Sequence, residues 1–116
     1  MDKKLMTIST SMMLLKLLEQ QDMYGYQMIQ TLNERSNSVF SMKEGTLYPI
    51  LHGLEREGCI ESYEKTAENG RCRKYYKITK EGLSTLKEKE SDWESYQKAV
   101  NQVMGRVAYG KVVYEI

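Results

Sequence analysis

The clearest pattern of hydrophobic and polar positions lies between Ser41 and Gly58. Ser41 and Glu44 have the spacing of a helix-capping box, and Gly58 can end a helix in a left-handed turn. Between them, apolar residues recur at i, i+3, i+4 and i+7, which places on one helical face Leu47, Ile50, Leu51 and Leu54. The pattern therefore predicts an amphipathic helix.

The opposite face of this predicted helix carries no large aliphatic side chain. It offers small residues and hydrogen-bond donors, namely Gly45, Pro49, His52 and Arg56, with Tyr48 at its edge. Pro49 lacks a backbone donor and is expected to bend the helix or tighten a turn. Such a face suits the major groove of DNA, although the stretch taken alone fits an ordinary surface helix better.

Two helices are expected before this one. Met6–Gln20 has a wide apolar surface, formed by Met12, Met13, Leu14, Leu15, Leu17 and Leu18. Such a helix is buried either inside a larger core or against a second chain, and the small size of the protein favours the second chain. Asp22 is a plausible cap for a second helix, Tyr24–Arg35, whose inner side would carry Tyr24, Met28, Ile29 and Leu32. Residues 36–41 lack periodicity and are typical of a turn, so the three helices predict a helix-turn-helix.

After Gly58 the pattern changes to alternation. Ile60–Glu64 and Arg73–Thr79 are rich in aromatic and β-branched residues and predict two strands. Asn69-Gly70 between them predicts a type I′ hairpin turn, with positive φ at both residues. A hairpin directly after a helix-turn-helix is a wing.

Charge is segregated onto this hairpin. The whole chain has a net charge of only +1, so a surface for nucleic acid must come from local clustering. The predicted wing supplies such a cluster with Lys65, Arg71, Arg73, Lys74, Lys77 and Lys80. Cations on a protruding hairpin favour phosphate binding, and the alternative is an edge hairpin protected from aggregation by its charge.

Thr79 is expected to cap a long C-terminal helix. Leu86, Trp93, Val100 and Val107 are seven residues apart, and Tyr96 and Val103 complete an a/d seam that predicts a dimer. The expected fold is mainly α with a small β-hairpin (α+β), a winged helix-turn-helix with a C-terminal dimerisation helix. Its expected parts are a DNA-binding domain over residues 1–79, the helix over residues 80–109 and a tail over residues 110–116.

Several classes of protein are disfavoured. The chain has two cysteines and one histidine, which do not form a zinc set, and free thiols are expected. It has no apolar run long enough for a membrane span and no signal-peptide pattern, which points to the cytoplasm. Since it also lacks a nucleophile motif, a carboxylate cluster and a glycine-rich phosphate loop, neither an enzyme nor a bound cofactor is expected.

Short motifs in this order resemble the PadR-like family of transcriptional regulators. The resemblance covers about residues 6–93, and more loosely residues up to 107. It rests on Tyr24-Gly25-Tyr26, Gly45-Thr46-Leu47-Tyr48-Pro49-Ile50-Leu51-His52, Leu54-Glu55, Glu57-Gly58, Gly70-Arg71, Arg73-Lys74-Tyr75-Tyr76 and Thr79-Lys80-Glu81-Gly82. Cys72 departs from the family pattern, which often has Pro or Arg between the two basic residues.

The resemblance implies a cytoplasmic repressor that dimerises through its last and first helices and binds a roughly palindromic operator. Several members look like regulators of efflux or stress genes, and some bind planar apolar compounds at the dimer interface. The candidate residues for such an effector are Trp93, Tyr96 and Met12. Two copies of Trp93 near a two-fold axis could flank a flat ring, although a packed seam residue without a ligand is the alternative.

Double-stranded DNA is thus the expected partner, besides a second copy of the chain. The residues expected to contact it are Lys43, Thr46, Tyr48, Pro49, His52, Arg56, Arg71, Arg73 and Lys74. The alternative function is a winged-helix module that binds protein rather than DNA. Such a module would be expected to carry acidic residues on the third helix and at the wing tip, where this chain carries His52, Arg56, Arg71 and Arg73.

Overall fold

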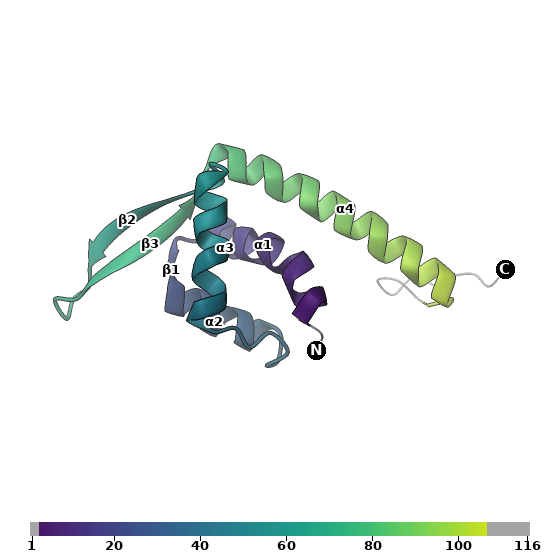
Figure 1. The fold of residues 1–116 in the computed structure, drawn as a ribbon, viewed down its shortest axis with the longest axis horizontal. Coiled ribbons are helices and arrows are strands. Elements are labelled where there is room, and N and C mark those ends of the chain that lie inside the picture. Colours follow the sequence, from purple (N-terminus) through teal and green to yellow (C-terminus); the bar gives the residue numbers. More distant parts are fainter. Residues whose placement is uncertain (1–2, 107–116) are drawn as a thin grey trace. The chain divides into compact units, whose positions relative to one another are not determined.

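The computed structural model describes residues 3–106, with side chains from Ser9 onward. These residues form four helices and three strands (Figure 1): α1 (Lys3–Gln20), β1 (Met23–Tyr24), α2 (Gly25–Arg35), α3 (Glu44–Arg56), β2 (Ile60–Thr66), β3 (Cys72–Ile78) and α4 (Lys80–Met104). The strands make one antiparallel sheet in the order β1-β3-β2. The expected α+β winged helix-turn-helix followed by a long helix is confirmed.

The chain divides into two compact units. The first runs to Leu86 and holds α1, α2, α3, the sheet and the start of α4, whereas the second begins at Lys87 within α4. The division expected from the sequence between residues 79 and 80 stays a prediction. Residues 107–116, which include Val107 of the expected seam and the expected tail, lie outside the described residues.

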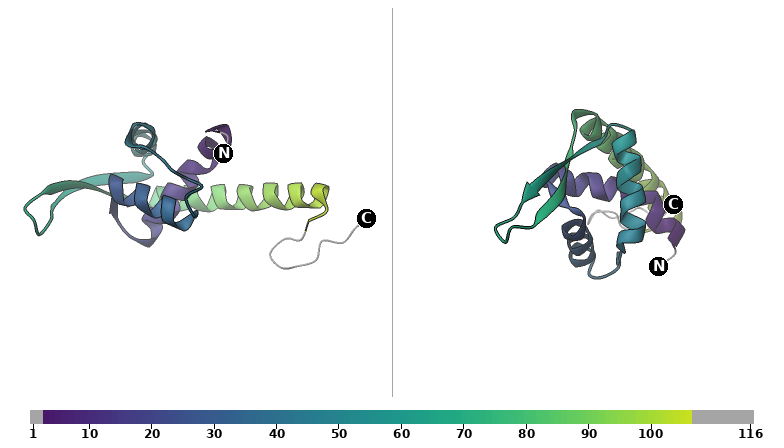
Figure 2. Two further views of the ribbon diagram at one scale, coloured as in Figure 1. Left: turned by 90° about the horizontal axis from the view of Figure 1, so that it is seen from below. Right: turned by 60° about the vertical axis from the view of Figure 1, so that its left-hand side comes forward.

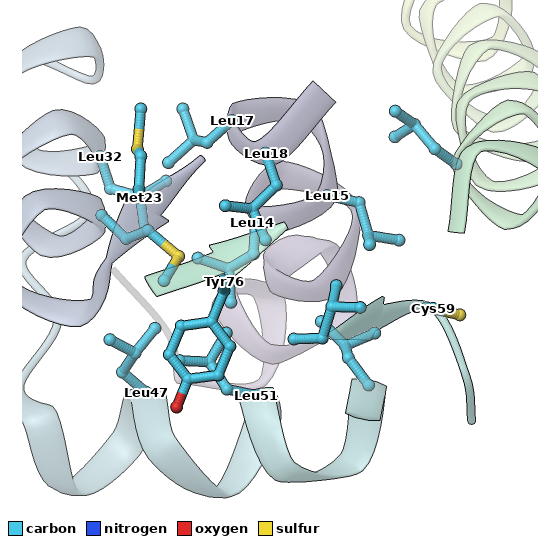
Figure 3. Close-up of a cluster of buried hydrophobic side chains, with 14 of the residues drawn as sticks. Leu14, Leu15, Leu17, Leu18, Met23, Leu32, Leu47, Leu51, Cys59 and Tyr76 are labelled. Atoms are coloured by element: carbon cyan, nitrogen blue, oxygen red, sulfur yellow. The ribbon is translucent and has the colours of Figure 1, made fainter. Parts of the chain in front are cut away.

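The core of the first unit lies between α1, α2, α3 and the sheet (Figure 3). Leu14 and Leu15 of α1 are fully buried, and Leu17 and Leu18 are 3% and 2% exposed. Because these four leucines are buried within their own chain, the expectation that they need a second chain is wrong. Helix α1 contacts both α2 and β3, which accounts for an apolar surface wider than one stripe.

Helix α3 starts later than the capping-box pattern predicts. Its N-cap is Lys43, whose backbone is extended, and no side chain caps the helix, so the expected role of Ser41 is wrong. The expected C-terminal end is confirmed, since Gly58 has a φ of +78° and the amide of Cys59 donates to the carbonyl of Leu54. Pro49 lies inside α3, as expected.

A third strand, β1, includes Tyr24, the residue at which α2 was expected to begin. Met23 pairs with Tyr76 and Tyr24 with Tyr75, so α2 begins only at Gly25. The predicted cap at Asp22 is wrong, because Tyr24 is the N-cap and no side chain caps α2. Met28 and Leu32 form the buried side of α2, with Ile29 packed against the core. Residues 36–41 form the turn, with Asn37 and Ser38 at positive φ.

The hairpin extends beyond the helices of the first unit in both views of Figure 2. Its turn is not type I′, because Asn69 is not among the residues with positive φ and only Gly70 of the pair has one, +83°. The amide of Gly70 donates to Ala67, and that of Ala67 to Arg71, which makes a three-residue loop. Gly70 then fills the left-handed position that follows the turn.

Helix α4 begins where the sequence predicts and ends earlier. The hydroxyl of Thr79 accepts a hydrogen bond from the amide of Gly82 at 3.0 Å, which confirms the cap. The helix ends at Met104, followed by Gly105 with a φ of +70°. Leu86 is 1% exposed in the core of the first unit, so its predicted place on a dimer seam is wrong.

Within residues 3–106 no helix is long and apolar enough to cross a membrane. In the same part of the chain no three His, Cys, Asp or Glu side chains are grouped so that they could hold a metal ion. Both cysteines are free, Cys59 buried and Cys72 exposed. Local desolvation of the sulfur, and secondarily the negative charge of Glu64 and its hydrogen bond to the thiol, raise the pKa of the exposed Cys72.

Candidate nucleic-acid interface

The face of α3 that the sequence assigned to DNA is open to solvent. Leu47, Leu51 and Leu54 are buried, which turns the opposite side of the helix outward. Exposed on that side are Gly45, Thr46, Pro49, His52 and Arg56, and Lys43 is exposed at the helix start. The unpaired amides of the first turn add partial positive charge there, which favours a phosphate.

Tyr48 lies at the edge of this face and is half buried. Its ring packs against the core, and its hydroxyl rests against Gly25 at the start of α2. A Cβ atom at Gly25 would lie 2.5 Å from that oxygen, so any larger residue there would force the Tyr48 side chain to move. The contact explains the glycine between two tyrosines at residues 24–26, and it gives Tyr48 a role in α2–α3 packing.

The two sides of the hairpin have different neighbours. On the inner side, Tyr76 is buried in the core, and the hydroxyl of Ser62 donates to a carboxylate oxygen of Glu55 on α3 at 2.9 Å. Lys74 is two residues from Tyr76 and therefore on the same side, with its ammonium 5.6 Å from the Tyr76 ring centroid. Lys74 is exposed, as is Arg71 in the loop.

Arg73 projects from the opposite, outer side of the hairpin. It is half buried, and its guanidinium carbon lies 4.4 Å from the ring centroid of Tyr24. The structure therefore does not bring together all the cations that the sequence grouped on the wing. Lys74 shares a side with α3, and Arg73 does not.

The hydroxyl of Tyr76 is a buried polar group beside α3. It points between Leu47 and Leu51 in Figure 3 and has no hydrogen-bond partner among the described residues. Burial raises the pKa of Tyr76, with smaller contributions from the charges of Glu55 and Tyr48. A neutral, protonated phenol is the form that this apolar site accepts.

The residues assigned to an effector lie in both units. Met12 is half buried against the core of the first unit. Trp93 and Tyr96 are 40% and 64% exposed on α4, with their ring centroids 6.3 Å apart. Beyond them, α4 has a shallow apolar hollow lined by Tyr96, Ala99, Val100, Val103 and Met104.

Sequence reasoning missed the residues that connect the hairpin to the helices, chiefly Tyr24, Tyr63 and Tyr75. Tyr24 was expected on the inner side of a helix, and it instead lies in β1 opposite Tyr75. The available signal was the alternation of tyrosines and cations along residues 63–65 and 73–75, which places them on one side of a sheet.

Comparison with known proteins agrees with this geometry. The model of the transcriptional regulator PadR-like family matches residues 14–88. A solved transcriptional regulator from Clostridium thermocellum has a TM-score of 0.79 and 32% identity over 86% of this chain and 97% of its own. A PadR-like transcriptional regulator from Bacillus cereus has a TM-score of 0.79 and 29% identity over 88% and 97%.

Two relatives are also similar in sequence. An uncharacterised protein from Lysinibacillus sphaericus is 35% identical over 78% of this chain and 84% of its own length. The transcriptional regulator Rv3488 of Mycobacterium tuberculosis is 33% identical over 62% of this chain and 64% of its own. The chain therefore belongs to the PadR-like family of transcriptional regulators, which are non-enzymatic DNA-binding proteins.

Proposed function

We propose that the protein is a homodimeric, ligand-responsive repressor that binds a pseudo-palindromic operator, with efflux or stress genes as its candidate targets. The observation that carries the DNA-binding part is the open face of α3 beside the cationic hairpin. A helix with a buried leucine face and an outer face of small and donor side chains can enter a major groove.

The contacts we propose on α3 fall into two kinds. His52 and Arg56 carry donors for base edges or nearby phosphates, and Pro49 with Gly45 lets the helix approach closely. Lys43 and Thr46 lie near the helix start, where a phosphate is favoured. On the hairpin, Arg71 and Lys74 are exposed and fit phosphate contacts. Tyr48 and Arg73 have intramolecular contacts, which support a role in holding these groups in place.

The second half of α4 supports the proposal of a dimer. Trp93, Tyr96, Val100, Val103 and Met104 are exposed and fall within an arc of about 100° at roughly 3.6 residues per turn. A second copy that covered this face would bury an apolar stripe, and two-fold symmetry would match two operator half-sites about 34 Å apart. An effector stacked on Trp93 and Tyr96 would change DNA affinity only by preferring one dimer spacing.

The test uses the duplex upstream of the protein's own gene, with a mixed-sequence duplex of equal length as the reference. Binding is measured over a range of salt concentrations, with and without planar apolar compounds. We expect the upstream duplex to bind more tightly and both affinities to fall with salt. We expect His52→Ala to reduce the preference by about 1–3 kcal/mol, the value of one good base contact.

A matched variant for this experiment is Ser84→Ala, on the exposed side of α4 in the first unit, which should leave both affinities unchanged. Equal affinity of the wild-type protein for the two duplexes at every salt concentration would contradict sequence-specific recognition of this segment. Trp93 fluorescence that no planar compound changes would remove the support for the effector site.

A further inference from the structure

The outer side of the hairpin carries a continuous layer of aromatic rings. Tyr24 of β1 contacts Tyr75 of β3 edge to face, with centroids 5.4 Å apart, and Tyr75 stacks on Tyr63 of β2 at 5.8 Å. One ring thus comes from each strand of the sheet. Both separations are in the favourable range for aromatic pairs, so the layer ties the three strands together on the side away from the core.

Each ring of this layer also has a polar or charged partner. The hydroxyl of Tyr63 donates to a carboxylate oxygen of Asp22 at 2.6 Å, and Asp22 directly precedes β1. The guanidinium of Arg73 lies over Tyr24 at 4.4 Å, and the ammonium of Lys65 lies 5.4 Å from the Tyr75 centroid. Cations at these distances are attracted by the negative face of the ring.

The layer also connects the hairpin to α3. Tyr24 is followed by Gly25, which begins α2 and packs against the hydroxyl of Tyr48 on α3. A change in the angle of the hairpin would have to break the contacts of Tyr24 or displace Gly25 from the hydroxyl of Tyr48. Lys74, on the other side of the hairpin, has no comparable attachment to β1.

We propose that Arg73 is a positioning residue for DNA binding: its stacking on Tyr24, together with the tyrosine layer, fixes the hairpin at the angle that delivers Lys74 and Arg71 to the phosphates. This inference rests on the proposed DNA-binding function. It differs from the expectation of the sequence, in which Arg73 itself contacts a phosphate.

The test compares two neighbouring substitutions that remove the same charge from opposite sides of one strand, Arg73→Gln and Lys74→Gln. Affinity for the mixed-sequence duplex is measured over a range of salt concentrations with the full chain. Loss of a phosphate contact reduces the slope of log affinity against log salt by about one unit. We expect this change for Lys74→Gln. For Arg73→Gln we expect an unchanged slope and a loss of about twofold to fivefold at every salt concentration, the fold-change of one exposed cation–π contact.

Two further measurements separate positioning from general stability. Tyr24→Leu should weaken binding about as much as Arg73→Gln, and the double variant should be no weaker than either single variant. Tyr24→Phe keeps the ring and should restore wild-type affinity. Hydrogen exchange at the hairpin amides should be faster in Arg73→Gln, while exchange in α1 stays as in the wild type.

The possible results are distinct. A slope reduced by about one unit in Arg73→Gln would make Arg73 a phosphate ligand and overturn the inference. Wild-type affinity in Arg73→Gln, or additive losses with Tyr24→Leu, would overturn it as well. If Tyr24→Leu does not fold, the comparison of Arg73→Gln with Lys74→Gln and the exchange measurement still decide. Failure of the wild-type protein to bind either duplex would instead refute the proposed function.

Discussion

The hydrogen bond between Tyr63 and Asp22 changes the pH at which the Tyr63 phenol loses its proton. It raises the pKa of Tyr63 to about 12, with smaller contributions from burial and from the charges of Asp22 and Tyr75. The folded state therefore holds the proton more strongly than the unfolded chain, whose tyrosine has a pKa of 10.0. The contribution of this hydrogen bond to the stability of the folded state is therefore complete below pH 10 and is lost as the pH rises through about 12.

Replacing Asp22 by Asn is expected to lower the pKa of Tyr63 toward 10.0, because a neutral amide no longer favours the protonated phenol. The measurement is the difference in tyrosinate absorbance between wild type and variant during an alkaline titration. Urea unfolding in the same pH range should show a smaller alkaline loss of stability in the variant. Glu61→Gln removes an equal charge from the same side of the hairpin and serves as the control. An identical titration of wild type and Asp22→Asn would contradict the assigned bond.

At the same scale, the sequence predicted which side chains are exposed more reliably than which of them are free to contact DNA. The face of α3 with Pro49 and His52 followed from helical periodicity, because burial of the leucines determines the opposite side. The contacts of Tyr48 and Arg73 could not be predicted in the same way. Their partners, Gly25 and Tyr24, lie more than twenty residues away in the sequence and reach them only through the tertiary fold.

At the scale of elements, the predicted helices and hairpin strands have strong local patterns, and β1 has none. Two residues, Met23 and Tyr24, cannot show a period, and they form a strand only because β3 offers a free edge. The start of α4 is likewise set by distant contacts. The hydroxyl of Thr79 donates to the carbonyl of Gly58 at 2.6 Å, and the amide of Thr79 donates to that of Cys59 at 3.0 Å.

Gly82 packs against the same segment, residues 58–59, and a substitution there tests this packing. A Cβ atom at Gly82 would overlap the carbonyl oxygen of Cys59, a backbone atom that cannot move aside alone. Gly82→Ala is therefore expected to lower the free energy of unfolding by about 1–3 kcal/mol, the usual cost of overpacking. Gly53→Ala in α3 meets only the end of Arg56 at 3.8 Å and should instead raise it by about 0.5–1 kcal/mol. Equal effects of the two changes in chemical denaturation would contradict the tight packing at Gly82.

At the scale of the whole molecule, the two units differ in how their apolar residues are used. The first unit buries Leu14, Leu15, Leu47 and Leu51 completely, whereas the second carries Val103 at 86% and Tyr96 at 64% exposure. A seven-residue period predicted this apolar face of α4, although Leu86 fits the same period and lies in the core. Spacing alone could not distinguish the buried Leu86 from the exposed residues of this face, because a heptad repeat does not show where a compact unit ends.

Val103→Glu is expected to convert the proposed dimer to a monomer, since a charge would be buried at the centre of an apolar seam. Val103 is exposed in the single chain, so the thermal unfolding of the first unit should not change. Operator affinity should fall by about a hundredfold or more, because the two half-sites would no longer be bound by linked subunits. Sedimentation velocity gives the oligomeric state, and Ser91→Glu, on the opposite side of α4, is the matched control. A dimer that persists in Val103→Glu but not in Ser91→Glu would place the interface on the other face of the helix.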